Sequence, residues 1–267
     1  MLGTGTSVGV PMIGCTCRTC TSPDPRDRRD RPGAMVQYED SAGEPRTVLL
    51  DTPTELRGQM IRHRVMRIDG VAYTHNHADH VFGLDDLRRF NAVMGEAIEI
   101  YGEADVITWI RRTFDYVFQP HVNVNDSFVP TLEPRTIRAG EPVAIAGRRW
   151  TPIRLMHGRV PIVGYRVGGF AYCTDCSEIP PESMELLEGL DVLAIDALRY
   201  RPHPTHMTID EALAAVDILR PRRAYLTHIA HDVLHAELEA QLPEHVYLAY
   251  DGLTIDVPGN GGNAEEG

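Results

Sequence analysis

The feature that most constrains this chain is a turn rich in metal-binding side chains directly behind an apolar, strand-like run at Val71–Tyr73. In the segment THNHADH, the side chains able to bind a metal are His75, His77, Asp79 and His80. Imidazole and carboxylate groups are common ligands of divalent metals. This spacing can hold two ions, with the first two histidines facing one ion and the carboxylate and last histidine facing the other. The alternative is an ordinary polar turn, which also favours Asn and Asp. The cluster predicts a hydrolytic metal site.

The pattern HxHxDH in this turn resembles the signature of the metallo-β-lactamase superfamily. The resemblance implies an α/β (α+β) chain folded as a four-layer αββα sandwich, with the metals at one edge of the two sheets. It also implies further ligands downstream, and candidates stand at the ends of strand-like runs: His157, Asp175 and His228. A single histidine at a strand end is usually structural. Together with the turn, these residues complete a ligand set for two ions bridged by Asp175 and a hydroxide.

A second cluster lies near the N-terminus, where Cys15, Cys17 and Cys20 follow the turn Gly3–Ser7. In an intracellular protein such closely spaced cysteines indicate a metal site more often than a disulfide framework, and tetrahedral zinc needs a fourth ligand. The alternative is reduced cysteines in a mobile loop. The segments GTGTSVGVP, CxCxxC and THIAH together resemble the PhnP-type phosphodiesterase branch of the superfamily. This resemblance implies that His231 completes a structural zinc site.

The same resemblance implies a catalytic histidine outside the metal set. In the segment HPTH, His206 matches the family histidine that stands beside the leaving group, just before a helix that opens with a capping box at Thr208 and Glu211. An imidazolium here can protonate a departing alkoxide, since histidine is the commonest general acid near neutral pH. His203 is the competing candidate, and its simpler interpretation is a surface-loop histidine. We therefore assign catalysis to His206, together with the ligand Asp79.

Composition limits the classes of function. The net charge of −12 argues against a nucleic-acid backbone as the main partner, because such binding depends on cationic side chains. All 26 basic residues are arginines, which excludes Schiff-base and P-loop lysine chemistry and favours metal activation. The sequence contains neither an apolar run long enough to span a membrane nor a signal-peptide pattern. We expect a cytoplasmic enzyme that acts on a small molecule, with a homodimer left open.

The apolar periodicity predicts a single domain over residues 1–257 and a disordered tail over residues 258–267. In the PhnP-type family the Gly3–Ser7 turn follows a complete first strand, whereas only Met1 and Leu2 precede it here, so that strand is expected to be truncated or to begin upstream. Strands are predicted at Val48–Asp51, Val71–Thr74, Ile98–Tyr101, Thr151–Met156, Ile162–Val167, Phe170–Thr174, Val192–Ala197, Ala224–Thr227, Val246–Ala249 and Leu253–Val257. Helices are predicted at Glu55–Val65, Gly83–Val93, Ala104–Phe118, Pro181–Leu187, Ile209–Leu219 and Val233–Leu242.

These features together predict a dinuclear metal-dependent phosphodiesterase with two divalent ions, zinc or manganese, in the active site and one structural zinc. The resemblance to the PhnP-type branch implies a small cyclic phosphate as substrate, such as phosphoribosyl 1,2-cyclic phosphate. Other functions remain open because one fold hosts many chemistries. They are a PqqB-like role in cofactor biosynthesis, RNA cleavage of the tRNase Z type, and a non-catalytic zinc-binding regulatory protein.

Overall fold

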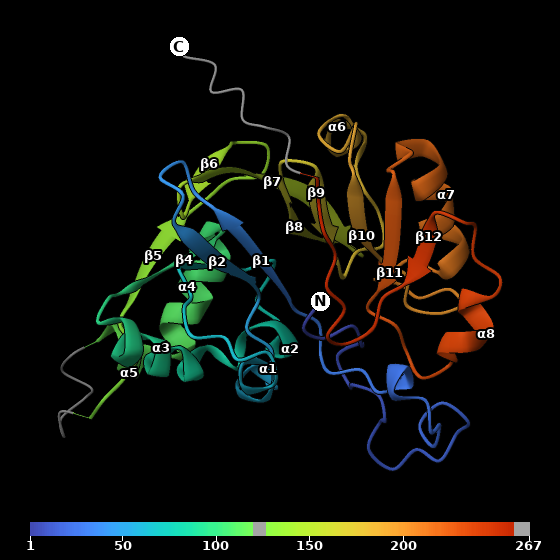
Figure 1. The fold of residues 1–267 in the computed structure, drawn as a ribbon, viewed down its shortest axis with the longest axis horizontal. Helices are drawn as coiled ribbons and strands as arrows, with labels where there is room; N and C mark the ends of the chain where they lie inside the picture. The colour runs from blue at the N-terminus through green and yellow to red at the C-terminus, as the bar shows by residue number, and fades with distance from the viewer. Residues whose placement is uncertain (120–126, 259–267) are drawn as a thin grey trace.

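Two β-sheets form the centre of the protein, which a computed structural model describes over residues 1–119 and 127–258 (Figure 1). The strands are β1 (Ala34–Glu39), β2 (Pro45–Leu50), β3 (Gly70–Ala72), β4 (Ile98–Gly102), β5 (Leu132–Thr136), β6 (Val143–Ile145), β7 (Arg148–His157), β8 (Val160–Val167), β9 (Phe170–Cys173), β10 (Val192–Asp196), β11 (Arg223–Thr227) and β12 (Val246–Leu248). The helices are α1 (Leu56–Arg62), α2 (Ala78–Val81), α3 (Leu87–Met94), α4 (Ala104–Thr113), α5 (Asp115–Phe118), α6 (Pro181–Glu185), α7 (Ile209–Leu219) and α8 (His235–Glu239), with 3₁₀ turns η1 (Pro25–Asp27) and η2 (Leu84–Asp86).

The first sheet has five strands in the order β1-β2-β3-β4-β5. Its edge strand β1 pairs antiparallel with β2, and the remaining neighbours are parallel. The second sheet has seven strands in the order β12-β11-β10-β9-β8-β7-β6. There β9 to β12 run parallel, and β6 to β9 are antiparallel neighbours. Parallel strands bring their carboxyl ends to one edge, which is where ligand sites form in such sheets.

Three buried apolar clusters fill the spaces between the layers, because strand side chains alternate between two faces. In β2, Leu49 packs under α1, α3 and α4, whereas Val48 and Leu50 face the second sheet. Strand β10 divides its side chains in the same way between the cluster under α7 and α8 and the cluster between the sheets. Figure 1 shows helices outside both sheets. This arrangement confirms the predicted four-layer sandwich.

The sequence missed three strands, β1, β5 and β6, all of which lie at the edges of the sheets. Their side chains are largely half-buried or exposed, so no apolar run marks them. The predicted strand Leu253–Val257 was wrong, because this segment is extended but pairs with no strand of the described chain. Its alternating apolar side chains pack against the cluster between the sheets instead. Around the Gly3–Ser7 turn the structure has isolated bridges of Gly3 with Gly33 and Gly5 with Ile229.

Several predicted helices are shorter than expected. The helix expected over residues 104–118 breaks at Phe114, whose φ of −108° and ψ of 47° are not helical, and becomes α4 and α5. The helix expected over residues 83–93 begins as the 3₁₀ turn η2 and continues as α3. α8 covers only the middle of its predicted range. The tail predicted to be disordered lies, from residue 259 onward, outside the described residues. No helix among the described residues is long and apolar enough to cross a membrane.

Candidate metal centre

The candidate site lies where the carboxyl ends of strands from both sheets meet. Asp51 follows β2, and the turn that carries His75 and His77 follows β3. Asp175 follows β9, and His228 follows β11. Asp51, Asp175 and His228 have positive φ angles between 62° and 66°, a conformation that residues other than glycine rarely adopt. Strained backbone of this kind clusters at functional sites.

Side chains from these strand ends converge on the carboxylate of Asp175. Two groups of ligand atoms that lie within 4.8 Å of one another join Asp175 to the turn, one of Asp79, His80, Asp175 and His228, and one of His75, His77 and Asp175. A third group joins Asp175 and His228 to Asp196 and His206. The Nε2 atoms of His80 and His75 lie 2.9 Å and 3.0 Å from Asp175 Oδ2. His228 Nε2 lies 3.3 Å from Asp175 Oδ1. Asp175 therefore stands between the two groups, in the position expected of a bridging ligand.

His157, which ends β7, lies on the side of the site that holds the first two histidines of the turn. Its ring centroid is 5.6 Å from that of His75 and 5.0 Å from that of His77. Its Nδ1 donates to the backbone carbonyl of Asp175 at 2.7 Å, which leaves Nε2 to act as a ligand. Desolvation by burial lowers the pKa of His157, so the ring is held in the neutral form that binds metals.

The donor atoms at this centre fit a pair of divalent ions. The buried atoms without a hydrogen-bond partner in the described chain include His75 Nε2, His80 Nε2, His228 Nε2 and Asp175 Oδ1, all at this centre. A buried polar atom without a partner costs free energy, so such atoms gathered at one place indicate a bound group. Burial also lowers the pKa of His228 to about 3, which keeps its imidazole neutral. Neutral imidazoles around a carboxylate are ligands for zinc, manganese or iron.

The sequence analysis missed Asp51, which fixes one of the candidate ligands. Its Oδ2 lies 2.7 Å from His80 Nδ1, and both atoms are fully buried. Its carboxylate also accepts from the backbone N–H and the hydroxyl of Thr74, at 2.8 Å and 2.9 Å. Metal-binding histidines usually donate their second ring N–H to such a partner, which sets the tautomer and the ring orientation. An acidic residue directly after the apolar run Val48–Leu50 was the available signal.

His206 lies beside the cluster and contacts a second carboxylate that the sequence analysis missed. Its Nδ1 lies 2.9 Å from Oδ2 of Asp196, the last residue of β10, and 3.0 Å from Asp175 Oδ1. Burial lowers the pKa of His206, but the hydrogen bond to Asp196 and the surrounding carboxylate charges raise it above its ordinary value. The capping box predicted at Thr208 and Glu211 is present and begins α7 directly behind this loop. The geometry leaves Nε2 as the atom that can carry a proton to a substrate.

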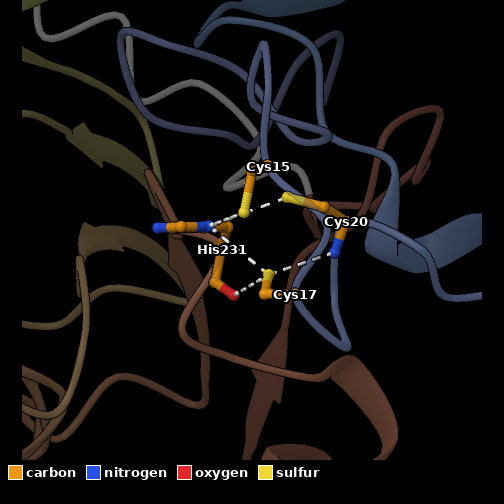
Figure 2. Close-up of side chains that lie close together, drawn as sticks. All are labelled: Cys15, Cys17, Cys20 and His231. Atoms are coloured by element: carbon orange, nitrogen blue, oxygen red, sulfur yellow. Dashed lines mark hydrogen bonds between the residues drawn. The ribbon is translucent and has the colours of Figure 1, made fainter.

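The three N-terminal cysteines gather around His231, as Figure 2 shows. The sulfurs of Cys15, Cys17 and Cys20 lie 3.2 Å, 3.5 Å and 3.7 Å from His231 Nδ1. The Cys20 N–H donates to the sulfur of Cys17 and lowers the pKa of that thiol to about 6. Thiolate is the form that binds zinc, and three sulfurs with one imidazole are a common structural zinc set. The donor chemistry therefore fits a single zinc ion.

Over residues 46–229 the chain matches the Beta-lactamase superfamily domain. The protein therefore belongs to the metallo-β-lactamase superfamily and has the fold of its metal-dependent hydrolases. Among solved structures, a diphosphatase from the PhnP family has 40% sequence identity and a TM-score of 0.85, over 96% of each chain. This similarity places the chain in the PhnP-like branch.

More distant structures share the fold. Zn²⁺-bound PqqB from Methylobacterium extorquens has 19% identity and a TM-score of 0.74, over 96% of this chain and 98% of that one. The short form of human tRNase Z has 21% identity and a TM-score of 0.66, over 96% and 97% of the two chains. An octanoyltransferase from Porphyromonas gingivalis is 36% identical over 255 residues, which are 95% of this chain and 50% of that protein. The chain thus spans about half the length of this relative.

Proposed function

We propose that the protein is a dinuclear metal-dependent phosphodiesterase that acts on a small cyclic phosphate, such as phosphoribosyl 1,2-cyclic phosphate. The observation that carries the proposal is the convergence of two ligand groups on Asp175, with the protonatable His206 ring beside them. One group consists of Asp79, His80, Asp175 and His228, and the other of His75, His77, His157 and Asp175. Two divalent ions held by these groups would attract a phosphodiester and neutralise the negative charge that develops on it.

The residues of the chain divide the remaining work between them. The chemistry that such a metal pair supplies is activation of a water molecule and neutralisation of charge on the phosphoryl group. Water oxygen becomes bonded to phosphorus as the bond from phosphorus to the leaving oxygen breaks. His206 Nε2 gives its proton to that oxygen, while Asp196 holds the Nδ1 side of the ring and favours the protonated form. Asp51 keeps the His80 ring in the orientation that binding requires.

A second substrate class is favoured by one observation. The structure with 40% identity is named a diphosphatase, and a phosphoric anhydride carries the same kind of electrophilic phosphorus as a phosphodiester. The two classes differ at the leaving group, because a phosphate leaves with less need of protonation than a ribose oxygen. RNA substrates fit poorly with the net charge of −12.

The test is a panel of substrates offered to protein reconstituted with manganese or zinc. Bis(p-nitrophenyl) phosphate reports phosphodiesterase chemistry, a five-membered cyclic phosphodiester of ribose reports the proposed class, and a nucleoside diphosphate reports the second class. We expect hydrolysis of the cyclic diester that disappears with a chelator and in Asp175→Ala. Metal-dependent cleavage of the diphosphate alone would favour the second class. If none of the compounds is cleaved in a metal-dependent way, the proposal is contradicted.

A further inference from the structure

The loop over residues 199–206, which joins β10 to α7, is held firmly at its base. Leu198 N–H donates to Met207 O, and Met207 N–H donates to Cys176 O just past Asp175. Within the loop, the Arg199 guanidinium donates to the carbonyls of residues 201 and 202, each at 3.2 Å. A loop tied down in this way can hold side chains in fixed positions at the site.

His203 in this loop has a defined hydrogen-bond pattern. The backbone N–H of Thr205 donates to His203 Nδ1 at 3.4 Å, and the Thr205 hydroxyl lies 3.1 Å from the same atom. Because a backbone N–H can only donate, Nδ1 must be the unprotonated, accepting nitrogen. The proton of the neutral ring is therefore on Nε2. Nε2 has no hydrogen-bond partner among the described residues.

The His203 ring lies beside the candidate catalytic cluster. The His203 ring centroid lies 4.9 Å from that of His206, which in turn lies 4.9 Å from that of His157. The turn after β7 packs against the same loop, since a Cβ on Gly158 would come within 3.0 Å of Pro204 O. Burial and the neighbouring His206 lower the pKa of His203, so the ring is neutral at physiological pH.

We propose that His203 is a substrate-binding residue whose Nε2–H donates to a non-bridging phosphoryl oxygen. The inference rests on the proposed function, since it needs a phosphoryl group bound beside His206. Two adjacent imidazoles then have different tasks. His206, whose Nδ1 side contacts Asp196, serves the leaving oxygen, whereas His203, whose Nδ1 accepts from Thr205, binds an oxygen that stays on phosphorus. A neutral donor suits this task because it keeps its proton through the reaction.

The chain offers a matched set of substitutions that separate the two nitrogens of His203. An Asn side chain reaches about as far as Nδ1 and can still accept from Thr205, whereas a Gln side chain places an N–H donor near the position of Nε2. We expect His203→Asn and His203→Ala to weaken binding of inorganic phosphate to the metal-loaded protein by about 10-fold or more, the usual effect of losing a hydrogen bond to a charged group. His203→Gln should retain affinity within about threefold of wild type. Isothermal titration calorimetry measures all of these affinities.

Kinetics on two substrates gives the second readout. Because a non-bridging oxygen is present in every phosphodiester, His203→Asn should lower kcat/KM equally for bis(p-nitrophenyl) phosphate and for a cyclic ribose phosphodiester. A loss confined to the cyclic ester would make His203 the proton donor and overturn the proposal. Equal phosphate affinity in all variants, or equal weakening in the Asn and Gln variants, would also overturn it. If wild type cleaves neither ester but the phosphate-binding pattern holds, the proposed function fails while the assignment of His203 stands.

Discussion

The two candidate metal sites are built in different ways. The His and Asp cluster is assembled from strand ends of both sheets, its central residues Asp175, His80 and His228 are no more than 2% exposed, and two of those three have left-handed backbone. The cysteine cluster lies in a loop with little regular structure, and Cys15 and Cys17 are half-buried. Strain and burial are costly, and they are tolerated where chemistry requires a fixed geometry. This difference favours the first site for the proposed reaction and the second for the attachment of a loop.

The cysteine cluster brings two distant parts of the chain together. Its cysteines come from residues 15–20 and its histidine from the segment just after β11, three positions beyond His228. The segment after β11 is also held by Arg29, whose buried guanidinium donates to the carbonyls of Ala230 and Val233 at 3.1 Å and 2.9 Å. Loss of zinc should therefore loosen the N-terminal loop while these contacts keep the segment after β11 in place.

The largest expected effect is that of removing the shared carboxylate. Asp175→Ala deletes the carboxylate that belongs to both ligand groups, so hydrolysis should fall to background and at least one of the active-site metals should be lost. Asp175→Asn, which keeps the volume, controls for packing. Retained activity in either variant would show that the reaction does not use this centre. The cysteine site should stay filled in both.

Removing the proton donor should have a smaller effect that depends on the substrate. His206→Ala should slow cleavage of a ribose cyclic phosphodiester by about 10²- to 10⁴-fold, the usual range for general-acid catalysis. Cleavage of a p-nitrophenyl ester should change far less, because p-nitrophenolate leaves without protonation. Rates on both substrates at fixed metal concentration measure the contrast. Equal losses would mean that His206 positions the phosphate or supports the metals.

The contact between Asp51 and His80 predicts a third and milder defect. Asp51→Asn keeps the shape but removes the charge that orients the ring, and such changes lower metal affinity or activity by about 10- to 100-fold. Activity of the variant should recover as manganese or zinc is added, since the ligands themselves remain. If added metal does not restore the activity, the variant is misfolded, and circular dichroism would detect this.

Much of the site was readable from the sequence because its residues follow apolar strands. The turn after β3 carries several ligands within a few residues, and that density distinguishes it from an ordinary loop. Asp51 follows an apolar run, and Asp196 ends one. If every acidic residue at the end of a predicted strand had been treated as a candidate, both would have been found. The sequence does not tell which strands of the two sheets end at the same place, because this depends on long-range packing.

The fold shows where periodicity misleads. Leu253, Ile255 and Val257 alternate with polar residues as in a strand, yet the segment packs these side chains without pairing its backbone. Alternation reports that one face is buried, and it carries no information about hydrogen bonds to a neighbour. The missed edge strands show that backbone pairing can occur without a buried face. β5 pairs along its length with β4, while most of its side chains are exposed.

The central claim is that the chain has two independent metal sites, one for reaction and one for stability. Metal analysis of wild type and Cys17→Ser, with thermal melting and hydrolysis measured on the same samples, tests it most directly. Wild type should hold about three metals per chain, in line with the usual ligand counts, and the variant about two. The variant should melt at a lower temperature and keep most of its metal-dependent hydrolysis. A variant with unchanged metal content and melting temperature would contradict the zinc site, and one that lost the active-site metals as well would contradict the independence of the two sites.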